Sequence, residues 1–371
     1  MDRPVYLFHR PGDGCGPDRD IGVREFPPAP ACMPALNTII TMPGAADFSL
    51  FQEVVSNCYE PGGPRSKGGH EPEAKDLVAC VVVVDDGRAV ARCAFYLDTG
   101  QQTGTRTAFV GSYECVEDPV VARKLFSEVR DTARKYRVHR IIGPMEGSIW
   151  NSHRFSDKND RPRFFMEPYH HAYYPEQWRA EGFVPLVRYI SRIDRELAVD
   201  ALSIRFRDED LANAGIAVRP LNKARLVQEL ALIGRFSIEA YKNEPLYTPI
   251  TVEEFVFKYH RMGHLLVPRL VLMAVDKKDD LLGFIFAVPD MFSPDRTGSV
   301  VHASARRKDA PQGLGTHLLR KLEQSAAELG FTSVIHAFMR TDDGPLRRGM
   351  RLPGAEPYGS YTLFELHMGG S

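Results

Sequence analysis

Two closely spaced glycines lie between a β-type run and an amphipathic helical pattern, within the segment Arg306 to Leu319. Gly313 and Gly315 allow the backbone to turn without Cβ clashes, so the first free N–H groups of the helix can point at a phosphate group. The basic run at 306–308 adds positive charge beside this turn. The segment therefore predicts a phosphate-binding turn; the alternative is a glycine turn that starts a surface helix beside a solvated basic run.

Four side chains that can take or give a proton lie in or beside β-type runs, namely Glu114, His302, Tyr358 and Tyr361. An imidazole with an unperturbed pKa near 6.5 suits general-base chemistry, and a carboxylate or a phenol can also transfer protons. Each residue has a structural alternative: a packed histidine, a tyrosine in ordinary strand packing, or a carboxylate at the edge of the core. The residue types alone leave both interpretations open.

The segment Glu167 to Tyr174 is dense in aromatic and imidazole groups. His170 and His171 are adjacent, and neighbours in an extended strand point to opposite sides, so the pair alone is a poor metal site. The six cysteines form no Cys-x-x-Cys pair, which favours reduced thiols. We therefore predict no metal site here and a structural or cleft-lining role for the segment.

The chain shows the same order of elements twice: strand, helix, hairpin, strand, helix, strand, irregular segment or short helix, strand. The first set is predicted at 38–42, 47–58, 78–84, 89–97, 108–116, 121–133, 139–143, 175–182 and 184–193. The second is predicted at 216–218, 226–241, a helix from Thr251, 270–275, 281–288, 299–304, 313–329, 334–339 and 360–367. This order predicts an α/β fold with two similar halves, each a mixed, mostly antiparallel twisted sheet flanked by helices.

Length and composition suggest how these elements are grouped. A chain of 371 residues exceeds what one hydrophobic core usually organises. We predict an irregular N-terminal arm rich in Gly and Pro at 1–35, a first domain at 36–200 and a second domain at 201–371. A charged linker, at about 194–215, joins the two domains.

The charge balance limits the partners of the protein. The formal net charge is -1 and the charged fraction is 26%, so no overall basic field favours nucleic acid or an anionic membrane. No apolar run approaches the roughly 20 residues of a membrane-spanning helix, and the first residues lack the apolar stretch of a secretory signal. We expect a cytoplasmic protein of uncertain oligomeric state.

The glycine turn resembles the pyrophosphate loop of the GNAT superfamily of N-acetyltransferases, Gln/Arg-x-x-Gly-x-Gly/Ala after the fourth strand. Gly313 and Gly315 match its two small positions, whereas Ala310 stands where the family has Gln or Arg. In the first half, the run Tyr173 to Phe183 resembles the Tyr-x-x-x-Gly-Phe ending that precedes the family's last strand. The loop of the first half at 117–118 has two acidic residues and no glycine. The whole is similar to bacterial tandem-GNAT proteins with a degenerate N-terminal half.

This resemblance implies acyl transfer from acetyl-CoA or another acyl-CoA to an amine of a small molecule or peptide. The pantetheine arm would pair with the fourth strand. The residues implied for CoA binding are Ala303, Ser304, Ala305, Arg306, Gln312, Gly313, Leu314, Gly315 and Thr316. Family members often use a glutamate of the fourth strand as the base and a tyrosine after the fifth strand as the acid. Here His302 is the nearest replacement for the glutamate, Tyr361 or Tyr358 is the candidate acid, and Glu114 is a relic or a second base.

Two alternatives remain open. Apolar residues such as Phe284, Phe286, Met291 and Phe292 would suit the transfer of a longer acyl chain. A non-catalytic acyl-CoA-binding or scaffolding protein would explain Ala310, the missing glutamate and the unusual run Thr341 to Gly344.

Overall fold

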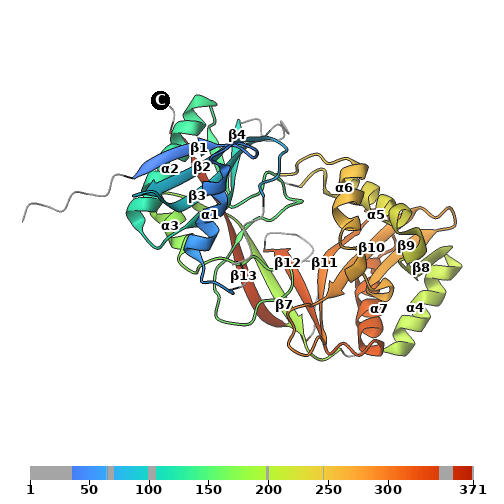
Figure 1. The fold of residues 1–371 in the computed structure, drawn as a ribbon. Coiled ribbons are helices and arrows are strands. Elements are labelled where there is room, and N and C mark those ends of the chain that lie inside the picture. The colour runs from blue at the N-terminus through green and yellow to red at the C-terminus, as the bar shows by residue number, and fades with distance from the viewer. Residues whose placement is uncertain are drawn as a thin grey trace, which may run out of the picture. The chain divides into compact units, whose positions relative to one another are not determined.

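The computed structural model describes residues 36–63, 65, 71–98, 106–197, 200–244, 246–341 and 354–369 of the chain. The predicted arm at 1–35 lies outside these ranges, and so does most of the run Thr341 to Gly344. In the described residues, the predicted mixed α/β class with helices flanking a mostly antiparallel sheet is confirmed (Figure 1).

All described strands belong to one sheet, in the order β1-β2-β3-β4-β5-β13-β7-β12-β11-β10-β9-β8, with β6 paired to β13. Only β4–β5 and β11–β12 pair in parallel. The strands are β1 (Asn37–Thr41), β2 (Leu77–Asp85), β3 (Arg88–Leu97), β4 (Thr107–Cys115), β5 (Arg140–Gly143), β6 (Phe155–Ser156), β7 (Val184–Asp194), β8 (Ile216–Pro220), β9 (Val271–Asp276), β10 (Leu281–Pro289), β11 (Gly298–Arg306), β12 (Ser333–Arg340) and β13 (Glu356–His367).

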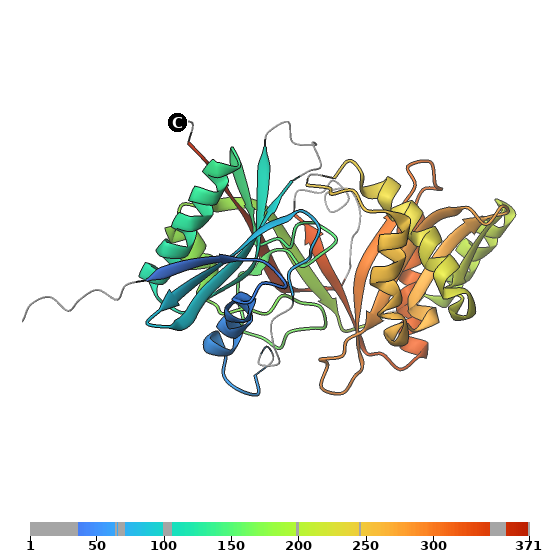
Figure 2. The ribbon, with the colours of Figure 1, turned by 45° about the horizontal axis from the view of Figure 1, so that its top comes forward.

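The last strand joins the two halves of the sheet. We expected β13 to complete a sheet of the second half, but it lies between β5 and β7, which belong to the first half (Figures 1 and 2). In turn β7 pairs with β12 of the second half. A strand pattern specifies a buried extended segment and not its partner, so this exchange is invisible in the sequence. The predicted boundary at residue 200 stays a prediction, since the pairing crosses it.

Helices cover both faces of the sheet because its strands bury side chains on both sides. In β2, Cys80 and Val82 belong to one hydrophobic cluster, whereas Val81 and Val83 belong to another. The first face carries α1 (Phe48–Cys58), α5 (Leu226–Tyr241) and α6 (Val252–His260). The opposite face carries α2 (Pro119–Lys135) and α3 (Tyr174–Ala180) in the first half, and α4 (Ala201–Asn213) and α7 (Leu314–Glu328) in the second.

The helix α4 occupies most of the stretch that we predicted to be a charged linker. Asp200 caps it by accepting a hydrogen bond from the Ser203 N–H (3.1 Å). Its buried residues are Ile204 and Leu211, and two apolar positions seven residues apart make too narrow a stripe to stand out in a charged sequence. The linker prediction is therefore wrong over α4.

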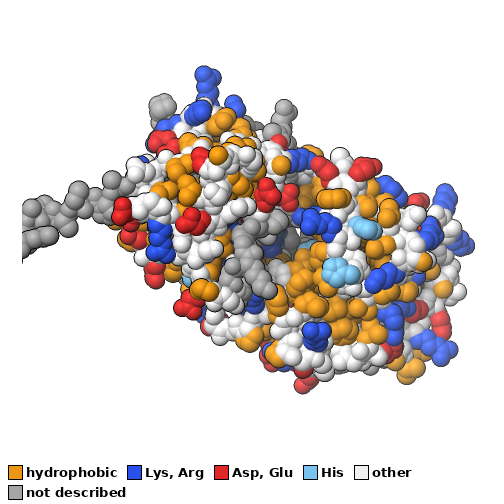
Figure 3. Space-filling model, in the orientation of Figure 1, with side chains coloured by type: hydrophobic (Ala, Val, Ile, Leu, Met, Phe, Trp, Pro, Cys, Tyr) orange, Lys and Arg blue, Asp and Glu red, His pale blue; other side chains and the backbone are white. Residues whose placement is uncertain are grey.

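Surface charge on the molecule is mixed. On the face drawn in Figure 3, Lys and Arg side chains alternate with Asp and Glu, and hydrophobic side chains gather on the second half. Among the described residues, no helix combines the length and the apolar character that a bilayer crossing requires. Cys58, Cys80, Cys93 and Cys115 are free thiols.

Candidate functional site

The strands β11 and β12 separate at His302. They pair in parallel from Gly298 to Val301, so His302 is the first residue beyond the last pair. On its other side, β11 stays paired with β10 as far as Arg306. Apart from that ladder, the described residues make one hydrogen bond to the backbone of residues 302–306, from the Tyr241 hydroxyl to the Ser304 carbonyl oxygen (3.1 Å). The described residues thus leave this strand edge open beside His302.

His302 is partly buried at the point of separation. Its Nε2 lies 3.3 Å from the hydroxyl of Tyr259 on α6. Burial lowers the pKa of His302 to about 4, with further contributions from the nearby charges of Arg154 and Lys258. Burial also raises the pKa of Tyr259, to about 12. The imidazole is therefore neutral near pH 7 and can accept a proton.

A small pocket of about 20 Å³ adjoins the imidazole. That volume corresponds to about one water-sized group. It lies against the face of the sheet that carries α5 and α6, but the first half also contributes a residue, Trp150. The lining residues are Trp150, Ile233, Ser237, Tyr241, Phe255, Tyr259, Phe284, Phe286, His302 and Ala303.

The predicted phosphate turn forms the start of α7. Gly313 is the N-cap residue and adopts a left-handed conformation (φ 81°), which glycine tolerates best. No described residue accepts a hydrogen bond from the backbone N–H of Gly315 or Thr316. The nearest atom to a Cβ built on Gly315 would be the Cδ of Arg306, at 3.7 Å. The turn thus offers free donors, open space and a positive side chain, which suit an anion.

Only part of the basic run at 306–308 is available to bind an anion. Arg307 forms an ion pair with Asp309, whereas Arg306 has no ion pair among the described residues. Ala310 is buried in the cluster of α7 and β10. The small side chain at the family's Gln/Arg position is therefore accommodated by core packing.

The equivalent opening in the first half is filled by the chain itself. The strands β4 and β5 pair only over residues 107–109. Beyond that point, the Met145 N–H donates to the Val110 carbonyl oxygen (2.8 Å), and the Glu146 carboxylate accepts from the backbone N–H and the hydroxyl of Ser112. The strand edge that is open in the second half is thus occupied here.

Close packing leaves no space in this first opening. A Cβ added to Gly111 would lie 2.7 Å from the Met145 carbonyl oxygen, inside van der Waals contact. At the start of α2, the Asp118 side chain accepts a hydrogen bond from the Val120 N–H (2.7 Å). Because a carboxylate already caps this helix and Glu117 lies beside it, an anion would be repelled.

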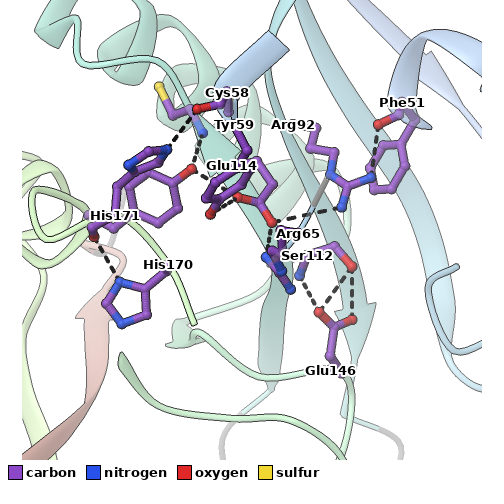
Figure 4. Close-up of polar contacts among 12 residues, drawn as sticks. Phe51, Cys58, Tyr59, Arg65, Arg92, Ser112, Glu114, Glu146, His170 and His171 are labelled. Carbon is purple, nitrogen blue, oxygen red and sulfur yellow. Dashed lines mark hydrogen bonds and ion pairs between the residues drawn. The ribbon is translucent and has the colours of Figure 1, made fainter. Parts of the chain in front are cut away.

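Glu114 lies in the first half, in a buried polar cluster on β4 (Figure 4). Its carboxylate accepts hydrogen bonds from the hydroxyls of Tyr59 (2.7 Å) and Tyr174 (2.9 Å). It also forms an ion pair with Arg65 and lies 4.0 Å from the guanidinium of Arg92. Every acceptor position of the carboxylate is thus directed at a partner.

Tyr361 is fully buried on β13. Its hydroxyl donates to the Glu167 carboxylate, which also pairs with Arg161, and burial raises the pKa of Tyr361. The hydroxyl of Tyr358 donates to the Pro162 carbonyl oxygen (3.0 Å). In the described part of the chain, no hydrogen bond joins these tyrosines or Glu114 to His302. Their catalytic roles stay predictions, and the structure does not bring them together.

Both ring nitrogens of His170 have protein partners. Nε2 accepts from the Ser156 N–H and Nδ1 donates to the His171 carbonyl oxygen, at 2.8 Å each. His171 donates to the Cys58 carbonyl oxygen and stacks on Tyr59 with ring centroids 4.4 Å apart. Both histidines therefore support the local packing.

Sequence reasoning missed the groups that reach His302 from other elements. Tyr259 lies one turn after Phe255, and their rings stack at 4.4 Å, so its spacing indicated only a buried helix face. The stretch from Trp150 to Arg154 showed no regular pattern. Its proximity to His302 arises from the tertiary fold.

No protein-family model matches the chain, and no curated protein matches it in sequence. Solved structures match it over about nine tenths of its length. A GCN5-related glucosamine N-acetyltransferase region in a fungal multi-domain β-N-acetylglucosaminidase is 10% identical, with a TM-score of 0.55, over 91% of this chain and 38% of the fungal chain. The chain thus spans less than half of that protein.

Two further structures cover more of their own length. A conserved protein of unknown function from Enterococcus faecalis is 8% identical, with a TM-score of 0.54, over 90% of this chain and 72% of that one. A GCN5-related N-acetyltransferase from Anabaena variabilis is 8% identical, with a TM-score of 0.51, over 89% and 72%. The chain therefore has the fold of the GCN5-related N-acetyltransferases.

Proposed function

We propose that the protein transfers an acyl group from acyl-CoA to an amine, in a site formed by its second half. The observation that carries this proposal is the separation of β11 and β12 at His302, next to the free N–H groups at the start of α7. The first offers a polar strand edge to an extended amide-containing arm, and the second offers donors to a diphosphate. The length of the acyl group is left open.

Each part of the donor would meet a different element. The edge formed by Ala303, Ser304 and Ala305 would pair with the amides of the pantetheine arm. The backbone from Gln312 to Thr316 and the side chain of Arg306 would bind the diphosphate. The reacting thioester would then lie at the separation point, beside His302.

Direct attack accounts for all atoms of the reaction. The neutral amine attacks the thioester carbonyl carbon, so a C–N bond forms and the C–S bond breaks. Because Nε2 of His302 is engaged with the Tyr259 hydroxyl, the amine proton passes to Nδ1 of the imidazole, and the thiolate leaves to take a proton from the medium or from a nearby acid. The hydroxyl of Tyr259 holds the imidazole in position through its hydrogen bond.

The first prediction concerns the α7 turn. Replacing Gly313 and Gly315 together by leucine should weaken CoA binding at least tenfold, or about 1.4 kcal/mol. The side chains would strain the left-handed residue and fill the open space above the first helical turn. Isothermal calorimetry of CoA binding checks this result.

Gly330 provides a matched control at the other end of the same helix. It also has a left-handed conformation (φ 86°) and open space around its Cβ position. The Gly330→Leu variant should suffer similar backbone strain yet keep its CoA affinity. Equal losses in both variants, or an unchanged affinity in the folded double variant, would contradict the assignment of the diphosphate site.

The second prediction concerns stoichiometry. Since Met145 and Glu146 fill the opening of the first half, CoA should saturate at one molecule per chain. Native mass spectrometry and calorimetry both count the ligand. Saturation at two per chain would show that the 145–146 segment moves aside.

The release of CoA separates this function from a non-catalytic acyl-CoA-binding protein. Mixing the protein with acetyl-CoA and a panel of amines should release a free thiol, detected with a chromogenic disulfide. Tight binding of acetyl-CoA without thiol release for any amine would favour the binding or scaffolding role.

A further inference from the structure

Arg154 is a buried cation for which the described residues supply no counter-ion. The residue is 9% exposed, and its guanidinium carbon lies 4.1 Å from the ring centre of Tyr189 and 4.4 Å from that of Phe338. Its Nη2 donates to Nε2 of His153, whose Nδ1 donates to the Asn151 carbonyl oxygen. No carboxylate of the described residues pairs with Arg154, and its buried Nε has no hydrogen-bond partner.

Two other arginines of the described chain have carboxylate partners. The buried Arg92 lies beside Glu114, and the partly buried Arg161 pairs with Glu167. Burial lowers the pKa of Arg154 to about 10, so the group still carries its charge near neutral pH. A buried charge without a partner is costly, and two aromatic rings offset only part of that cost. An anion from outside the chain would complete the site.

The backbone of Arg154 is unusual as well. Its φ is 76°, in the left-handed region that residues with side chains rarely adopt, and Phe338 on the other side of the guanidinium has a φ of 56°. Strained residues persist where the surrounding structure fixes them, and they concentrate at binding sites. The position of this guanidinium is therefore specified by the fold.

The segment that contains Arg154 lies near His302. The charge of Arg154 contributes to the low pKa of His302. The same segment places Trp150 in the pocket beside the imidazole, and the Lys258 ammonium donates to the Asn151 side chain (2.6 Å). The charges of Arg154 and Lys258 thus both act on the group that would accept the proton. The diphosphate of CoA has its own donors at the start of α7, so it does not explain them.

We propose that Arg154 binds a carboxylate of the acceptor, so that the acceptor is an amine that also carries a carboxylate, such as an amino acid. The inference rests on the proposed acyl transfer. A guanidinium fork matches the two oxygens of a carboxylate. A first half that no longer binds CoA would thereby supply the recognition of the acceptor.

The test compares two probes that differ only in charge. Calorimetry with the full chain and bound CoA should show acetate binding at least tenfold more tightly than acetamide. The Arg154→Gln variant should lose this preference, and Arg154→Lys should keep part of it. Arg163 gives a matched control, because it is likewise stacked between two rings, of Tyr169 (4.6 Å) and Phe292 (4.4 Å), without an ion pair. Its Gln variant should keep the preference.

Several results would overturn the proposal. These are equal binding of the two probes, a preference that persists in folded Arg154→Gln, or one lost in Arg163→Gln. A dependence on Arg154 that appears only with carboxylated donors such as succinyl-CoA, and not with carboxylated amines, would place the carboxylate on the acyl group instead. Because binding needs no turnover, a carboxylate preference in a protein that releases no CoA would refute the acyl transfer and leave the anion site standing.

Discussion

Replacing His302 by glutamine should lower the turnover number about a hundredfold or more while CoA still binds. Glutamine is similar in size and can accept a hydrogen bond from Tyr259, but it cannot take the proton of the attacking amine. The imidazole lies at the separation of β11 and β12, where the thioester is proposed to react. Steady-state kinetics and CoA calorimetry on the same preparation measure the two quantities.

The pH profile adds a second measurement. The pKa of His302 is lowered to about 4, so the imidazole is already neutral above pH 5. We therefore expect no rise in activity near the unperturbed value of about 6.5. Activity should instead increase with the neutral fraction of the acceptor amine. The unperturbed value that the sequence analysis considered therefore does not apply to this histidine.

The lowered pKa of His302 also makes the folding stability of the protein depend on pH. A histidine whose pKa is lowered on folding contributes stability that is complete above its unfolded pKa, about 6.5, and is lost as the pH falls towards 4. The His302→Gln variant should lack this part of the acid sensitivity. Urea denaturation at pH 7 and pH 5 tests the difference.

His336 is a suitable control for this substitution. It is a buried histidine of β12 whose pKa burial also lowers to about 4, but it lies within the paired part of the strand, opposite Val301. Its Gln variant should keep its turnover. Comparable turnover of His302→Gln and the parent would mean that water or the acceptor's own neutral fraction supplies the base.

The elements of the fold were largely predictable because both faces of the sheet are buried. Continuous apolar runs such as 78–84 clearly indicate buried strands. The order strand, hairpin, strand, helix then restricts the topology, and the glycine turn marks the start of α7. The exchange of β13 was not predictable, since it depends on which of two similar edges a strand meets.

The candidate site was predictable only along β11 and α7, where its residues are close in sequence. Arg154 and Tyr259 approach His302 from the first half and from α6. A single arginine in an irregular segment forms no sequence pattern that would indicate a binding site. Its significance appears only in the structure, where its buried Nε has no hydrogen-bond partner and no carboxylate of the described residues pairs with it.

Glu114 should prove essential for stability and dispensable for turnover. The Glu114→Gln substitution keeps the size of the side chain but removes the charge that Arg65 and Arg92 share. Removing one partner of a buried ion pair typically costs about 3–5 kcal/mol. We expect about 3 kcal/mol, the lower end, because the side chain of Arg65 is 35% exposed and can reach water. Urea denaturation at pH 7 measures the change.

Glu117 controls for the loss of a carboxylate in the same region. It is exposed and lies three residues further on, so its Gln variant should change the free energy of unfolding by less than about 0.5 kcal/mol. Folded Glu114→Gln protein should turn over at the parent's rate, because its cluster has no hydrogen bond to His302 and the nearby opening is closed by Met145 and Glu146. If the Glu114→Gln variant kept the parent's stability but lost its turnover, this interpretation would be wrong. Glu114 would then act as the base, and the first half would hold the active site.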